Sequence, residues 1–262
     1  MPPALPEAIE WRYEMENMTV DVHDEVALLR LTSGVTNAIG SAMLTELSST
    51  LAEIKKEYRG CVLTGGTKFF SIGLNLTELI GFDREEMNRF WDAFDQAVLD
   101  LYTLPMPSAA AISGHAVAGG TILALCADFR LITPGRNFMG LNEINIGVPV
   151  PYLADLMLRQ IVGDRVATDL SYKGELLPPE VALEVRLVDE MSTEENIEAR
   201  ALEMISRLAE KPRRAFGLIK QNRTEAVRLK FEENRAERKE EMLSCWFEPS
   251  VHELLEKAAE KF

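Results

Sequence analysis

The chain has 262 residues, of which 47% are hydrophobic and 27% are charged, and its net charge at pH 7 is −14. This length suffices for one large α/β domain with a smaller helical region. The acidic balance argues against nucleic acid as a partner, because phosphate backbones bind basic surfaces. No apolar run reaches membrane-spanning length and the first ten residues resemble no secretory signal, so we expect a cytoplasmic protein without membrane contact.

The three cysteines, Cys61, Cys126 and Cys245, lie far apart in the sequence and in apolar surroundings. Such spacing is typical of buried thiols, not of a metal cluster or a disulfide framework. We therefore predict no metal site.

The first predicted elements are a hairpin of two strands at 11–21 and 25–31, an amphipathic helix at 41–58 and a buried strand at 60–65. Asp83 and Glu86 form a capping-box pattern that begins a long helix, and Pro105 and Pro107 end it. Further strands are predicted at 108–112 and 129–133, and helices at 152–162, 166–172, 178–185, 194–209 and 213–231. Strand, helix and strand alternate, which favours a parallel sheet.

Residues 232–262 are predicted to form a charged amphipathic tail. Its large apolar side chains fall on one narrow stripe, which we expect to be exposed and to pack on another surface such as a second subunit. These side chains are Met242, Leu243, Trp246 and Phe247.

A glycine-rich turn follows the strand at 108–112, and the pair Gly119-Gly120 then opens a short helical run. Adjacent glycines let a ligand approach the backbone, and the first N–H groups of a helix have no partner inside the helix. Such a turn could hold an oxyanion, although a tight turn with close packing explains a glycine pair equally simply. The loop at 65–76 is of the same kind.

One acidic residue, Glu143, stands alone among the thirteen residues from 137 to 149. Apolar and amide neighbours would desolvate its carboxylate and raise its pKa toward the range of a general base. A helix-capping role or a pair with a distant arginine is the alternative. Two backbone donors and one carboxylate together suit enolate chemistry, in which the donors stabilise the charge that proton removal creates.

Residues 211–230 carry seven basic side chains and one acidic one, Glu225, on a chain that is otherwise acidic. This segment could contact a polyphosphate ligand, or it could be a solvated helix face.

These motifs resemble those of the crotonase (enoyl-CoA hydratase/isomerase) superfamily. Residues 70–79, FSIGLNLTEL, are similar to the family pattern F-S-A-G-x-D-L-x-E-M, residues 114–120 resemble its second oxyanion-hole loop, and residues 126–130 resemble its C-D-x-R pattern. The resemblance implies an α/β fold, a spiral of ββα units, with a C-terminal helical region used in trimer formation. It divides the chain at 1–195 and 196–262, and it makes the N–H groups of Leu74 and Gly119 the oxyanion donors.

The departures from the pattern indicate which reaction to expect. Hydratases of the family carry two catalytic glutamates, and Ile122 stands in place of the first, whereas Glu143 retains the second. The chain is most similar to the mitochondrial type of Δ3,Δ2-enoyl-CoA isomerase within the family. Ile72 in place of alanine and Asn75 in place of aspartate could alter the acyl pocket or the start of the helix.

We therefore predict isomerisation of a 3-enoyl-CoA to a trans-2-enoyl-CoA, with Glu143 carrying a proton from C2 to C4. Coenzyme A is part of the substrate, so no separate cofactor is expected, and the resemblance implies a homotrimer or a dimer of trimers. The expected substrate-binding residues are Lys68, Ile72, Ile122, Asn142 and Lys220. Another reaction on a CoA thioester, hydration or hydrolysis, is one alternative, and a non-catalytic CoA-ester binding subunit is another. We expect structural roles for His115 and for Asp128, the latter as a local cap or in a pair with Arg130.

Overall fold

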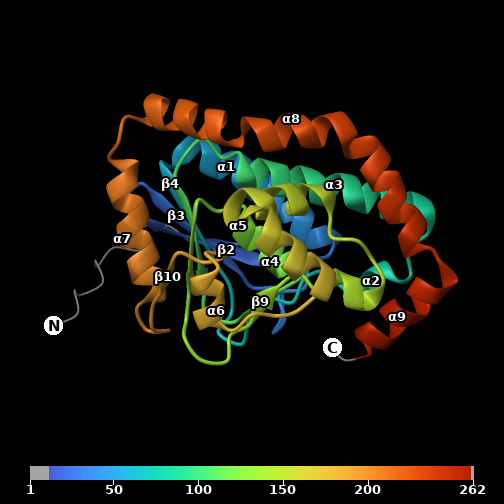
Figure 1. Cartoon of the computed structure of the whole chain (residues 1–262). Coiled ribbons are helices and arrows are strands. Elements are labelled where there is room, and N and C mark those ends of the chain that lie inside the picture. The colour runs from blue at the N-terminus through green and yellow to red at the C-terminus, as the bar shows by residue number, and fades with distance from the viewer. Residues whose placement is uncertain (1–11, 261–262) are drawn as a thin grey trace.

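The computed structural model describes residues 12–260, which form two β-sheets and the helices around them (Figure 1). The larger sheet has the strand order β1-β2-β3-β4-β6-β8-β10. Pairing is antiparallel from β1 to β3 and parallel from β3 to β10. The strands are β1 (Arg12–Glu14), β2 (Met18–His23), β3 (Val26–Leu31), β4 (Gly60–Thr64), β6 (Ser108–Ile112), β8 (Phe129–Ile132) and β10 (Glu190–Met191).

A smaller parallel sheet places the functional loops. It consists of β5 (Phe69–Ser71), β7 (His115–Val117) and β9 (Met139–Gly140). These strands lead respectively into helix α2 (Leu76–Leu79), helix α4 (Gly119–Leu125) and the 3₁₀-helix η1 (Glu143–Ile146). Because the carboxyl ends of parallel strands meet at one edge, the two glycine loops and Glu143 come together there.

Helices cover both faces of the larger sheet. Helix α7 (Ile197–Ala209) packs on one face, with a core of its own against β3, β4 and β6. The main core contains residues of α1 (Ser41–Glu57), α3 (Arg84–Tyr102) and α4. Strand β4 is buried along its whole length, which explains its continuous apolar sequence.

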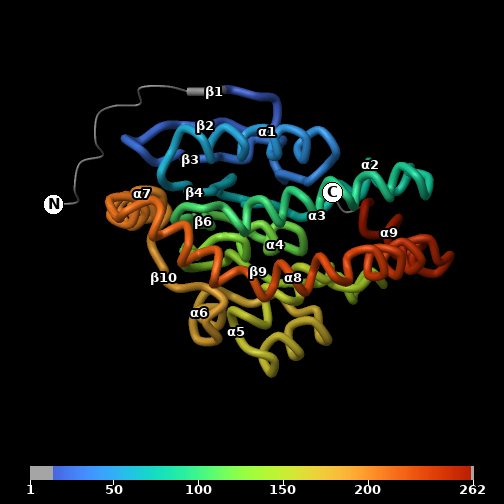
Figure 2. The backbone as a smooth tube through the Cα atoms, turned by 90° about the horizontal axis from the view of Figure 1, so that it is seen from above, coloured from blue at the N-terminus to red at the C-terminus, as the bar shows by residue number. Residues whose placement is uncertain are grey.

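The C-terminal third of the chain forms α5 (Tyr152–Lys173), α6 (Pro179–Glu184), α7, α8 (Arg213–Trp246) and α9 (Pro249–Ala259). Helix α5 is interrupted at Gly163, which has φ 78° and ψ 160°, so the two separate helices predicted on either side of this residue are confirmed. Helix α8 runs along the molecule beside α3 and α5, and α9 turns back toward α2 (Figures 1 and 2).

The α/β class, the parallel sheet and the C-terminal helices match the predictions. The capping box of α3 is also confirmed, because Asp83 accepts from the N–H of Glu86 and the Glu86 side chain accepts from the N–H of Asp83. The first predicted strand was wrong in its extent: residues 15–17 form a turn that divides it into β1 and β2, so three antiparallel strands replace the hairpin.

The prediction of an exposed apolar stripe in residues 232–262 was wrong. Met242 is 5% exposed, and Leu243 and Trp246 are each 1% exposed. All three belong to the main core of this same chain. The stripe therefore packs on its own chain, and α8 and α9 complete the main core.

Candidate active site

A cavity of about 100 Å³ lies at the carboxyl edge of the smaller sheet, and we call it the reaction chamber. Its walls are almost entirely apolar, and Glu143 is its one ionisable side chain. The chamber contains most of the site residues that the sequence predicts: Ile72, Leu74, Gly119, Ile122, Asn142 and Glu143. The structure therefore brings residues from three separate loops to one place.

The two glycine loops approach each other closely at Gly73 and Gly119. A Cβ atom on Gly73 would lie 2.9 Å from the nitrogen of Gly119, so neither loop leaves room for a side chain at this contact. Among the described residues, no protein acceptor is recorded for the N–H groups of Leu74 and Gly119. Two unpartnered donors on adjoining loops form an arrangement that can stabilise a developing oxyanion.

The residue before Gly119 has an unusual backbone conformation. Ala118 has φ 49° and ψ −117°, a region that non-glycine residues rarely adopt. Its N–H donates to the carbonyl of Gly140, and Thr121 donates through its hydroxyl to the carbonyls of Ala116 and Gly140. Strain of this kind persists only where the surroundings hold it, and it accumulates at functional sites.

Glu143 is buried, with 5% of its surface exposed, and burial raises the pKa of its carboxyl to about 7. Its Oε2 atom has no hydrogen-bond partner among the described residues. A carboxyl without a charged partner favours its neutral form, which brings its pKa near the operating pH of a general base. The sequence-based expectation of a desolvated Glu143 is confirmed.

Ile122 lies one turn into α4 and is 1% exposed, so no carboxylate occupies that wall of the chamber. The other departure, Asn75, keeps the role of a helix cap: its side-chain oxygen accepts from the N–H of Glu78 at 3.3 Å. The change from aspartate to asparagine therefore leaves the start of α2 intact.

The C-terminal helices supply a wall that sequence reasoning missed. Met242 and Trp246 of α8 and Ala258 of α9 line the chamber together with the α3 residues Trp91 and Phe94. The signal was present in the sequence as the apolar stripe at 242–247, but the stripe alone does not tell which surface it covers.

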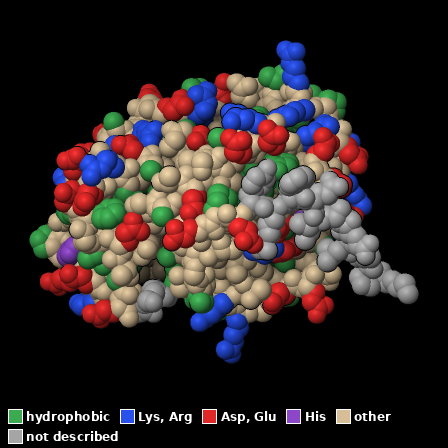
Figure 3. All heavy atoms as spheres, turned by 180° about the vertical axis from the view of Figure 1, so that it is seen from behind, with side chains coloured by type: hydrophobic (Ala, Val, Ile, Leu, Met, Phe, Trp, Pro, Cys, Tyr) green, Lys and Arg blue, Asp and Glu red, His purple; other side chains and the backbone are tan. Residues whose placement is uncertain are grey.

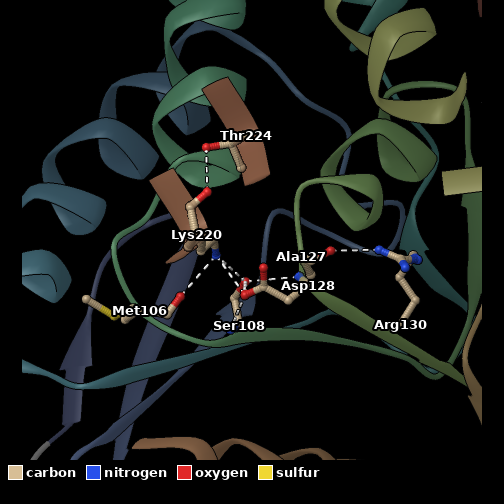
Figure 4. Close-up of polar contacts among 7 residues, drawn as sticks. All are labelled: Met106, Ser108, Ala127, Asp128, Arg130, Lys220 and Thr224. Carbon is tan, nitrogen blue, oxygen red and sulfur yellow. Dashed lines mark hydrogen bonds and ion pairs between the residues drawn. The ribbon is translucent and has the colours of Figure 1, made fainter. Parts of the chain in front are cut away.

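Lys220 does not lie in the chamber, and its predicted contact with a CoA phosphate was wrong. Its side chain is 4% exposed, and its ammonium donates to Asp128 at 2.7 Å, the Met106 carbonyl at 3.0 Å and Ser108 Oγ at 3.2 Å (Figure 4). An ammonium group has three donors, so none remains for a phosphate.

The same network corrects the expected pair of Asp128 with Arg130. Arg130 donates instead to Asp189 and to the carbonyls of Ala127 and Leu187 (Figure 4 shows the Ala127 contact). Both residues have structural roles, as expected for Asp128, but with different partners.

Most of the basic segment 211–230 also lies far from the chamber. Lys220 precedes Met242 by 22 residues on α8, about 33 Å along the helix. On the face shown in Figure 3, acidic and basic side chains are mixed across the surface.

Lys68 and His115 lie at the opposite ends of their strands from the glycine loops. Lys68 is exposed, with its Nζ 5.5 Å from the Phe69 ring centroid. The His115 ring stacks on Phe138, and its Nδ1 accepts from the Phe138 N–H at 3.1 Å. This contact gives His115 the structural role that was expected.

Within residues 12–260, no group of three or more His, Cys, Asp and Glu side chains is arranged to hold a metal ion. No helix in the described part of the chain is long and apolar enough to cross a membrane.

Comparison with known proteins assigns the chain to a family. The enoyl-CoA hydratase/isomerase family model matches residues 21–262. Human mitochondrial enoyl-CoA delta isomerase 1 is 32% identical over 199 residues, which are 74% of this chain and 66% of the human protein. Its mouse counterpart is 31% identical over 209 residues, 77% of this chain and 72% of that protein.

A crystal structure of human mitochondrial delta3-delta2-enoyl-CoA isomerase superposes with a TM-score of 0.90 at 29% identity and covers 94% of this chain and 97% of that one. The paired glycine loops, the buried glutamate and these matches lead to one conclusion. The chain belongs to the enoyl-CoA hydratase/isomerase family.

Proposed function

We propose that this protein isomerises a 3-enoyl-CoA to a trans-2-enoyl-CoA. The observation that carries the proposal is the chamber itself, in which one buried carboxylate lies with two unpartnered backbone N–H groups. The similarity to curated enoyl-CoA delta isomerases supports the same reaction.

In this mechanism the Glu143 carboxylate removes a proton from C2 of the substrate. The electron pair moves toward the thioester oxygen, and the N–H groups of Leu74 and Gly119 donate to the negative charge that develops there. Each donor in such an oxyanion hole contributes about 3 kcal/mol. The carboxylic acid then returns the proton to C4, so the double bond moves from C3–C4 to C2–C3 and no atom is gained or lost.

Ile122 favours isomerisation over hydration. Addition of water needs one group to activate the water and a second to share the proton transfers, whereas a proton shuttle between two carbons needs only one. The apolar side chain of Ile122 occupies the wall of α4 beside Glu143 in the chamber. The experiment described below distinguishes isomerisation from two alternatives. One is hydration or hydrolysis with Glu143 as the base, and the other is binding of a CoA ester without turnover.

Further proposals concern the substrate and the assembly. We assign Lys68, which is exposed and has no recorded ion pair among the described residues, to a CoA phosphate, and Ile72, Ile122 and Asn142 to the acyl group. The reaction would need no cofactor besides the coenzyme A of the substrate. Residues 196–262 would serve oligomerisation as a homotrimer or a dimer of trimers. The cytoplasmic location stays a prediction, since the relatives include mitochondrial and peroxisomal proteins.

The test is incubation with 3-hexenoyl-CoA in heavy-oxygen water, followed by mass spectrometry of the product. The proposal expects 2-hexenoyl-CoA without heavy oxygen. A 3-hydroxyacyl product, or free acid, that carries the label would indicate hydration or hydrolysis instead. Binding without any product would indicate a non-catalytic subunit.

A further inference from the structure

A second cavity, of about 360 Å³, lies next to the reaction chamber. Five residues line both cavities and therefore form the wall between them: Trp91, Val148, Pro149, Pro151 and Met242. The second cavity is more than three times the volume of the chamber. Whether an acyl chain can reach it depends on this wall.

Trp91 is the largest side chain of the wall, and its neighbours hold it in place. It is 3% exposed and contacts Phe94 edge-to-face, with ring centroids 5.3 Å apart, and Phe90 at 6.0 Å. Phe94 lines the reaction chamber but not the second cavity, and Phe90 lines neither cavity. An indole clamped between two aromatic rings cannot swing aside without disturbing α3.

The second cavity has an apolar part of its lining that suits an acyl chain, beside six charged side chains. Val150, Tyr152 and Phe231 contribute apolar surface to its lining. Its charged residues are paired with one another or with neighbours: Arg235 lies 3.7 Å from Asp95, and Lys239 lies 2.7 Å from Asp92. The cavity therefore has no need of an ionic ligand to balance its charge.

We propose that Trp91 sets the acyl chain length that this protein accepts, by closing the chamber against the second cavity. The inference rests on the proposed function for its substrate class. In the intact protein the chamber takes short acyl chains, because Trp91 stops the chain beyond the reacting carbons. Replacing the indole by a methyl group joins the two cavities and gives a longer chain an apolar path.

The experiment compares kcat/KM for 3-dodecenoyl-CoA and 3-hexenoyl-CoA in the wild type, Trp91→Ala and Phe90→Ala. Each newly buried methylene is worth roughly four-fold in binding. Because six methylenes separate the two substrates, we expect Trp91→Ala to raise the ratio of the long to the short substrate by at least about tenfold. Phe90→Ala, a truncation of an equally buried aromatic on the same helix, should leave the ratio unchanged.

A ratio for Trp91→Ala within twofold of the wild type would overturn the inference, as would a wild type that prefers the long substrate. If Trp91→Ala fails to fold, Trp91→Leu, which leaves a smaller void, is measured in its place. If the wild type turns over neither substrate, the proposed function fails. Calorimetric measurement of hexanoyl-CoA and dodecanoyl-CoA binding still tests whether Trp91 limits the length of the acyl chain. Trp91→Ala should then strengthen dodecanoyl-CoA binding at least about tenfold relative to hexanoyl-CoA, and an unchanged ratio would contradict the inference.

Discussion

Burial of Glu143 costs the folded protein free energy at neutral pH, and in the proposed mechanism it also makes the carboxylate a base. Among residues 12–260, two acids have a pKa raised to about 7 by burial, Glu143 and Asp95. They differ in geometry: Glu143 lines the chamber with the two backbone donors, whereas Asp95 lies in the interface of α3 and α8 near Arg235. A raised pKa therefore marks a functional residue only together with its surroundings.

The activity should follow the ionisation of Glu143. Its carboxyl must be deprotonated to accept the C2 proton, so kcat/KM for 3-hexenoyl-CoA should rise with pH and level off above an apparent pKa of about 7. A pH–rate profile between pH 5 and 9 measures this value. An activity that is already maximal at pH 5 would contradict a buried, unpaired base.

Stability should show the opposite dependence. The folded-state pKa lies above the usual 4.5, so the folded state loses stability as pH rises from 4.5 through about 7. Glu143→Gln removes this cost and should raise the free energy of unfolding by up to about 3 kcal/mol at pH 8, and by less at pH 5.5. Denaturant titrations at both pH values check this. Asp95→Asn, the control, should also raise the free energy of unfolding at pH 8, because burial raises the pKa of Asp95 to about 7 as well, and it should keep its turnover of 3-hexenoyl-CoA.

Helix α8 contacts the rest of the protein differently near its two ends. Near its N-terminal end, Lys220 joins it to Asp128 and Ser108, at the turn after α4 and the first residue of β6. Near its C-terminal end, Met242 and Trp246 line the chamber. A helix held at both ends can keep the chamber wall in register with α4.

Removal of the Lys220 ammonium should affect stability and not substrate binding. Lys220→Met leaves Asp128 without its buried partner, and we expect a loss of about 3 kcal/mol in the free energy of unfolding. Lys230→Met on the same helix removes an exposed pair with Glu233 and should leave the free energy of unfolding almost unchanged. Thermal unfolding together with KM measurements tests both variants. A raised KM with unchanged stability in Lys220→Met would restore the phosphate contact that the sequence suggested.

The sequence predicts the long elements better than the short ones. The helices α1 and α3 and strands β4, β6 and β8 follow from periodic apolar patterns and caps. Strands β5, β7 and β9 have only two or three residues each, too few for a period-two pattern to appear, yet they bring the loops together. Similarly, the sequence shows that Lys220 is basic but not that Asp128, 92 residues away, is its partner.

In the whole molecule, the chain closes its own site. Helix α9 contacts both α2 and η1, and Val251 packs beside Gly147 at the end of η1. Helix α9 therefore contacts both α2, which follows the first glycine loop, and η1, which begins with Glu143. Excluding water from such a chamber strengthens the electrostatic interactions inside it and prevents side reactions.

Loosening this helix should impair catalysis. Leu255 is fully buried in the main core, and Leu255→Asp should detach α9, lower kcat/KM at least about tenfold and lower the melting temperature. Lys257→Asp, at an exposed position on the same helix, should leave both unchanged. Activity assays and thermal melts of the two variants test this prediction. Full activity in Leu255→Asp would show that the chamber does not depend on α9.

The site residues are predicted from the family motifs, whereas the residues that pack around the site are not. Leu74, Gly119, Glu143 and Ile122 were assigned from motifs and occupy one chamber, because those motifs sit on loops that the small sheet aligns. The sequence pattern predicts that Met242 and Trp246 are exposed, since an apolar stripe has the same pattern whichever surface it meets.

The role of Glu143 is tested by the turnover number of Glu143→Gln with 3-hexenoyl-CoA at pH 8. The amide keeps the size of the side chain but cannot accept a proton, so we expect a loss of at least about a thousandfold in kcat in a protein that is folded and at least as stable as the wild type. Turnover near the wild-type value would contradict proton transfer by this single buried carboxylate.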